Sequence, residues 1–349
     1  MQSRRIGLIV LIVVLVAAVA AGIARFSGSG FQWSEFGQSL ASLHGGWATA
    51  AVVLNLITYL IRALRWQVMM TPIRPNASLR HLITATAIGF TAVLLFGRPG
   101  ELVRPWLISV RERVTLSSQI AAWFLERIFD LLSVVLLFGI SLAGLRSDLA
   151  VPAQIRDLLQ AAGWLAVVAG AGCVLFLLVA ALFTERARSG AAAIAGILPA
   201  RIGGFVQRSL DAFLTGLQST GDLRTLGAVL GWTAVEWILI SGSMYSLLRA
   251  FPPTSGFSLN DTLVFTGFVV FGGIVQLPAI GGGLQAAAVL ILTQLFGLGI
   301  EPATAFALLV WAVSWLAIAP FGLFFAFTEG LQWQNLRNIS NQEAKAVEG

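Results

Sequence analysis

The stretch Phe96-Gly-Arg-Pro-Gly-Glu-Leu-Val-Arg-Pro-Trp106 closes an apolar run, residues 82–96, that holds no charged residue. The run is shorter than the roughly 20 residues that a helix needs to cross the hydrocarbon core of a bilayer. It stops at Pro99 and Gly100, two helix breakers that stand between an arginine and a glutamate. The pattern predicts an apolar segment that enters a membrane and turns back inside it.

The composition is typical of a polytopic membrane protein. Of the 349 residues, 57% are hydrophobic and only 11% are charged, and the mean hydropathy is +0.86. These values predict an all-α membrane helical bundle. The net charge of +6 comes from arginines that alternate with apolar runs, so we expect no nucleic-acid partner. The two histidines and the single cysteine lie far apart in the chain, and we expect neither a metal site nor a cofactor.

Six apolar runs are long enough to cross a bilayer as full spans. They are Ile6–Ala24, Trp47–Met69, Ser118–Gly144, Gly163–Phe183, Leu226–Leu248 and Ala303–Phe327. With a cytoplasmic amino terminus, most arginines fall in cytoplasmic segments, as the positive-inside rule requires. This count assigns Arg62 and Arg65 to the cytoplasmic side. If residues 82–96 also crossed, the arginines from Arg186 to Arg224 would lie outside, which again favours a segment that returns.

The spans and the charge bias together predict one membrane domain, residues 1–349, in the inner (cytoplasmic) membrane of the cell. Both termini are expected in the cytoplasm, and residues 328–349 are expected to form a short cytoplasmic tail.

A second segment repeats the pattern of the first. Asp261–Gln276 is mostly apolar and is followed by Leu277-Pro-Ala-Ile-Gly-Gly-Gly-Leu-Gln285. Residues 82–144 and 261–327 therefore share an order of apolar arm, break, return arm and full span. By the loop charges the two units enter from opposite sides, which predicts an inverted repeat of two re-entrant helical segments. Close helix packing is the alternative explanation of the glycines. The predicted break or hinge residues are Pro99, Gly100, Pro278, Gly281, Gly282 and Gly283.

Charged residues stand in the middle of the span Ser118–Gly144, where each costs about 2.5–3.5 kcal/mol on insertion scales. Arg127 and Asp130 are three residues apart and can pair on one helix face, so mutual neutralisation is the structural alternative. The functional interpretation is a headgroup site, because guanidinium groups bind phosphate oxygens bidentately. The candidate substrate-binding residues are Arg98, Glu101, Arg104, Glu126, Arg127 and Asp130, with Gln276 and Gln285 beside the second break.

Glu236 stands alone in the span Leu226–Leu248, without a charged neighbour within one helical turn. It must either meet an arginine across the bundle or be protonated. It is a candidate proton carrier, and a neutral hydrogen-bonded acid is the alternative.

Three motifs resemble one family. Gly97-Arg-Pro-Gly-Glu-Leu-Val-Arg104, Glu126-Arg-Ile-Phe-Asp130 and Leu277–Gln285 are similar to elements of the flippase-like integral membrane family that includes the transmembrane region of lysylphosphatidylglycerol synthases. The resemblance implies translocation or handling of a polar-headed lipid between leaflets. Many relatives carry an Arg-Glu pair after the second glycine cluster, where alanines follow Gln285 here, so the resemblance leaves the lipid open.

These observations predict a flippase-like lipid transporter, not an enzyme. It is expected to move a lipid with a polar, anionic phosphate headgroup between leaflets. Two alternatives remain open. One is a membrane-embedded lipid-modifying transferase with Glu101 or Asp130 as its base, and the other is an accessory subunit that presents lipid to a partner enzyme. No P-loop or dinucleotide fingerprint occurs in the sequence, so we expect no ATP drive within this chain.

Overall fold

The structure, a computed structural model, describes residues 31–147, 149, 151–182, 223–273, 276–277 and 281–329. The predicted first span, Pro278 and the predicted tail beyond residue 329 lie outside these ranges. The described residues form ten α-helices, two short 3-10 helices and one ribbon of two-residue strands. The all-α prediction is confirmed. The α-helices are α2 (Trp33–Ala41), α3 (Gly45–Met70), α4 (Leu79–Phe96), α5 (Val103–Glu112), α6 (Leu116–Ala143), α7 (Ala153–Leu182), α10 (Leu223–Ala250), α11 (Leu259–Gly272), α12 (Gly283–Gln294) and α13 (Ile300–Thr328).

Five described helices have the length and composition to cross a membrane, namely α3, α4, α7, α10 and α13. Predicted spans are confirmed as helices in α3, α10 and α13, and α7 begins ahead of the predicted Gly163. Two differences concern α4 and α6. The helix α4 gains one turn before residue 82 and so reaches spanning length, whereas α6 is long but carries three charged residues at its centre.

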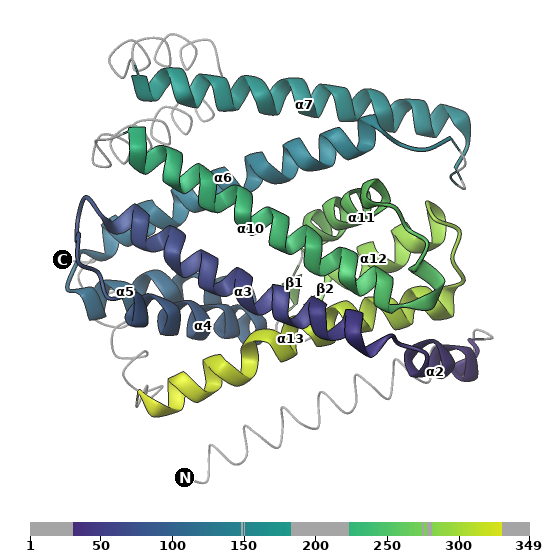
Figure 1. The fold of residues 1–349 in the computed structure, drawn as a ribbon, viewed down its shortest axis with the longest axis horizontal. Helices are drawn as coiled ribbons and strands as arrows, with labels where there is room; N and C mark the ends of the chain where they lie inside the picture. The colour runs from purple at the N-terminus through teal and green to yellow at the C-terminus, as the bar shows by residue number, and fades with distance from the viewer. Residues whose placement is uncertain are drawn as a thin grey trace, which may run out of the picture.

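The long helices cross the molecule from end to end in Figure 1, with α3 beside α10 and α6 beside α7. Two shorter helix pairs fill the space between them: α4 and α5 lie at one end, and α11 and α12 lie toward the other. The ribbon between α11 and α12 lies near the middle of the molecule.

In the first helix pair the chain reverses at the predicted break. The helix α4 ends at Gly97, whose φ of 71° is in the left-handed region that favours glycine. The 3-10 helix η1 (Arg98–Leu102) follows, and α5 then runs back along α4. Gly100 lies directly against the backbone of Ala92, where a Cβ atom would overlap it. The reversal therefore needs two glycines, one for its backbone angle and one for close approach.

We expect Gly100→Ala to destabilise the protein by about 1–3 kcal/mol, because an added methyl group must push η1 away from α4. The thermal unfolding midpoint of the purified protein in detergent measures the effect. Gly172→Ala is the matched control, since no neighbouring atom lies within contact distance of a Cβ on that exposed α7 residue. Equal midpoints for the two variants would contradict the close approach of η1 and α4.

The second helix pair has the same order of elements. The helix α11 leads to strand β1 (Gln276–Leu277), which pairs antiparallel with β2 (Gly281–Gly282), and α12 and α13 follow. Gly282 has a φ of 98°, so this turn also depends on a glycine. A Cβ on Gly272 would lie 2.6 Å from the carbonyl oxygen of Gly283, which shows how closely α11 approaches the start of α12.

The apolar core has two parts. One is built mainly from α11, α12 and α13, and the other from α3, α4, α5 and α6. Along α10, Val229 belongs to one part and Leu247 to the other, and the buried Glu236 lies between them. The charged residues of the bundle thus lie where the two cores meet.

Candidate functional site

Arg65 of α3 is the centre of a buried ionic network. Its side chain is fully buried and meets three carboxylates from two other helices: Glu126 Oε1 at 2.5 Å, Asp130 Oδ1 at 2.7 Å and Glu236 Oε2 at 3.1 Å. The Thr233 hydroxyl accepts a further hydrogen bond from it at 3.1 Å. One guanidinium group therefore joins α3, α6 and α10.

The Arg65 side chain points into the bundle and has no exposed surface, so Arg65 is a buried residue of α3 and not a loop charge. Its assignment to the cytoplasmic side stays a prediction. Loop-charge counting places a residue by its position along a span, whereas the direction of its side chain depends on which helices pack on that face. The sequence held a signal for this. If Arg62 and Arg65 are counted as loop residues, the predicted spans hold three carboxylates but only one arginine, Arg127, so the carboxylates lack partners.

Glu236 meets arginines across the bundle, which was one of its two predicted alternatives. Its Oε1 lies 2.8 Å from Arg62 Nη2, and its Oε2 faces Arg65. The Glu236 side chain is fully buried, and both of its arginine partners belong to α3. Its role as a proton carrier stays a prediction.

Arg104 holds α5 against three neighbouring helices. Its Nη1 lies 3.1 Å from Glu126 Oε2, its Nη2 donates to the Arg62 carbonyl at 3.0 Å, and its guanidinium lies 4.1 Å from the centre of the Trp66 ring. Gly89 of α4 lets it approach, because a Cβ there would lie 2.6 Å from the Arg104 Cβ. With only 5% of its side chain exposed, Arg104 is placed as a structural anchor within the network.

Arg127 and Asp130 pair on one face of α6 at 3.0 Å, as their spacing predicts. Arg127 also lies 3.5 Å from Glu126, and 34% of its side chain remains exposed. Arg98 and Glu101 form a second pair at 2.7 Å within η1. The buried network holds four arginines and three carboxylates and so carries one formal positive charge. Its members are Arg62, Arg65, Arg104, Arg127, Glu126, Asp130 and Glu236.

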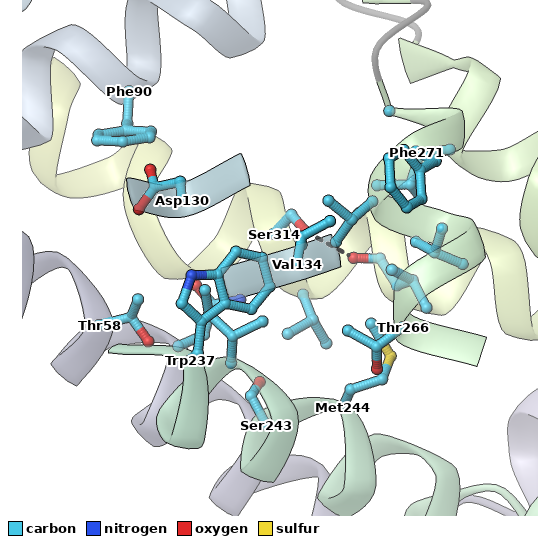
Figure 2. Close-up of a pocket in the computed structure, with 18 of the residues that line it drawn as sticks. Thr58, Phe90, Asp130, Val134, Trp237, Ser243, Met244, Thr266, Phe271 and Ser314 are labelled. Atoms are coloured by element: carbon cyan, nitrogen blue, oxygen red, sulfur yellow. Dashed lines mark hydrogen bonds between the residues drawn. The ribbon is translucent and has the colours of Figure 1, made fainter. Parts of the chain in front are cut away.

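A cavity of about 470 Å³ lies beside this network. Arg62, Arg98, Arg127 and Asp130 supply its charged lining, and the rest of its wall is mostly apolar side chains of α6, α10, α11 and α13. Figure 2 shows Asp130 and Phe90 on one side of the cavity, Phe271 on the opposite side, and the Trp237 indole between them. The cavity is therefore amphipathic, with a cationic end.

Both helix pairs contribute to this cavity. Arg98 comes from η1 at the turn of the first pair, and Phe271, Gly273 and Leu284 come from either side of the turn of the second. Residues that flank the two predicted breaks, distant in the sequence, thus line one cavity.

The other predicted site residues lie elsewhere. Glu101, Arg104 and Glu126 line a smaller cavity of about 80 Å³, and Arg127 lines both cavities. The Gln285 Oε1 accepts a hydrogen bond from the Gly282 N–H at 2.7 Å and so holds the second turn. Gln276 forms the ribbon through its backbone. Within the described ranges, no three His, Cys, Asp or Glu side chains gather as metal ligands would.

Five apolar helices of spanning length and a charged cavity enclosed among helices define a multi-pass membrane protein. The chain belongs to the family of the lysylphosphatidylglycerol synthase transmembrane region, whose model matches residues 8–322. The resemblance inferred from its motifs is confirmed.

A segment of 97 residues is 30% identical to the glycosyltransferase AglD of Haloferax volcanii. The match covers 28% of this chain and 16% of AglD, so the activity of that whole protein carries over only as a proposal. No solved structure matches the chain.

Proposed function

We propose that this protein is a flippase-like lipid transporter that moves a lipid with an anionic phosphate headgroup between the leaflets of the inner membrane. The observation that carries the proposal is the amphipathic cavity at which both helix turns meet. Its cationic end suits a phosphate, and its apolar walls suit the first part of an acyl chain.

In this proposal Arg98 and Arg127 hold the headgroup together with Arg62, which replaces Arg104 among the contacts expected from the sequence. All three arginines line the large cavity, and Asp130 is the one carboxylate among its described lining residues. When no phosphate is bound, Glu126 and Asp130 hold the Arg127 guanidinium extended. Glu236 does the same for Arg62, and Glu101 for Arg98. The excess of one positive charge in the network favours an anionic ligand over a neutral or cationic one.

The two helix pairs act in this proposal as re-entrant segments of an inverted repeat, with both termini cytoplasmic. They lie toward opposite ends of the long helices in Figure 1, and their turns border one cavity. Alternate opening of each pair would expose the cavity to one leaflet at a time. Glu236 could couple this movement to a proton, because it lies in the network beside Arg62.

Lipid transport by the purified protein in vesicles tests the proposal. We expect faster exchange between leaflets for at least one anionic phospholipid in a panel of fluorescent and native lipids, relative to protein-free vesicles. A panel in which no anionic lipid moves faster would contradict the transporter.

A lipid-modifying transferase is the second candidate, because the relative AglD is named a glycosyltransferase. Glu101 or Asp130 would act as the base on a lipid hydroxyl. Product formed by the purified chain from lipid and a sugar or aminoacyl donor would support it. Stable co-purification with a lipid-modifying enzyme, without transport by the isolated chain, would instead support an accessory subunit.

A further inference from the structure

Trp237 of α10 lines the large cavity, and its buried indole N–H is an uncommitted hydrogen-bond donor in the cavity wall. Only 8% of the residue is exposed, and its Nε1 has no hydrogen-bond partner among the described residues. A buried indole N–H normally finds an acceptor, because leaving it unpaired costs about 1–3 kcal/mol. In a wall that is otherwise mostly apolar, such a donor points to an acceptor on a ligand.

Four aliphatic hydroxyl groups of the same wall donate to backbone carbonyls of the protein. Thr58 donates to the Leu54 carbonyl at 3.0 Å, and Ser243 donates to the Ala51 carbonyl at 2.8 Å. Thr266 and Ser314 each donate to a carbonyl one turn earlier in their own helix, at 2.7 and 2.9 Å. Trp237 differs from all four, because its donor meets no carbonyl of the described chain.

The position of Trp237 limits what the ligand atom can be. In Figure 2 the indole nitrogen is drawn on the side of the ring toward Asp130 and Thr58, and Phe271 lies on the opposite side of the cavity. A phosphate held by Arg62, Arg98 and Arg127 leaves the indole facing the next part of the lipid. The donor is neutral, so it suits an uncharged oxygen more than a second anionic group.

We propose that Trp237 forms a second subsite of the cavity, which binds an uncharged acceptor oxygen next to the lipid phosphate. This inference rests on the proposed function. The oxygen can come from two sources, an ester carbonyl of the acyl chains or a hydroxyl of the headgroup. A lipid whose hydrocarbon chain starts directly at the phosphate offers neither.

Binding of matched lipids to the detergent-purified protein tests the subsite. The reference is dioleoyl phosphatidylglycerol. Its dialkyl ether analogue lacks the ester carbonyls, and dioleoyl phosphatidylpropanol lacks the headgroup hydroxyls but keeps the phosphodiester charge. We expect the wild-type protein to bind one of these two analogues about three- to tenfold more weakly than the reference, the effect of one hydrogen bond.

Trp237→Phe should remove this preference, because the variant should bind the reference lipid only as tightly as it binds that analogue. Since Nε1 has no partner in the described protein, the substitution breaks no internal hydrogen bond there. Trp311→Phe is the matched control, because its Nε1 is also unpartnered but the residue is not part of the cavity lining. Trp311→Phe should keep the wild-type preference.

The analogue that loses affinity identifies the source of the oxygen, carbonyl or hydroxyl. A wild-type protein without either preference, or a preference that survives in Trp237→Phe, would overturn the subsite. Transport of phosphatidylglycerol in vesicles is measured in parallel. If lipid is transported but Trp237→Phe and Trp311→Phe show the same lipid preference, the subsite is wrong and the proposed transporter is not contradicted. If no lipid is transported, the proposed transporter is itself contradicted.

Discussion

Glu126→Gln is expected to destabilise the protein by about 3–5 kcal/mol, the largest effect of any substitution considered for this chain. The Glu126 side chain is fully buried and lies within 3.5 Å of Arg65, Arg104 and Arg127. Of these three, Arg104 has no other carboxylate in an ion pair among the described residues. Neutralising Glu126 would leave four arginines facing two carboxylates in a region with little water.

The thermal unfolding midpoint in detergent measures this loss. Asp157→Asn is the control, because Asp157 is 69% exposed and lies 3.7 Å from Arg156, a surface pair of little expected worth. Adding Arg104→Met to Glu126→Gln should recover part of the stability, since the stranded charge is then removed as well. A double variant that is less stable than Glu126→Gln alone would contradict the ionic explanation.

Arg127→Gln is expected to lower lipid transport about 10- to 100-fold while the protein stays folded, because a hydrogen bond to a charged group is worth about 1.5–3 kcal/mol. Arg127 lines the large cavity and is partly exposed there. The change leaves neither carboxylate partner without an ion pair. Asp130 still pairs with Arg65, and Glu126 still pairs with Arg65 and Arg104. The loss should therefore appear in transport and much less in stability.

Initial transport rates in vesicles, with matched amounts of folded protein, measure this effect. Arg127→Lys should restore part of the rate, because a lysine keeps the charge without the bidentate geometry. Arg74→Gln removes an equal charge from a side chain that is 55% exposed and outside the cavity lining, so it should transport normally. If Arg127→Gln and Arg74→Gln transport equally well, the assignment of Arg127 to the headgroup is wrong.

Local chemistry was readable from the sequence. The all-α class and the spans in α3, α10 and α13 follow from apolar length, which needs no knowledge of neighbouring helices. The first reversal follows from the Pro99-Gly100 pair, because backbone freedom and a missing N–H act within one turn. The left-handed angle at Gly97 was seen only in the structure. The Arg127–Asp130 pair follows from its spacing on one helix.

Spanning length shows the limit of such local criteria. By length and composition alone, α4 passes as a crossing helix and α6 does not. Yet α4 leads into a reversal, and α6 carries its charges at the centre of the buried network. Both facts depend on which helices pack against α4 and α6. The hydropathy of a short sequence segment carries no information about those neighbours.

The tertiary structure alone decided which charges meet. Arg65 is central, Arg104 is an anchor on Trp66, and Arg62 lines the cavity, because α3 crosses α6 and α10 at the level of Glu126 and Glu236. The sequence by itself determined that buried charges and two helix breaks exist. Their meeting at one cavity depends on contacts between residues far apart in the sequence, such as Arg62 with Glu236 and Arg65 with Thr233. Those contacts are set by helix packing and not by local spacing.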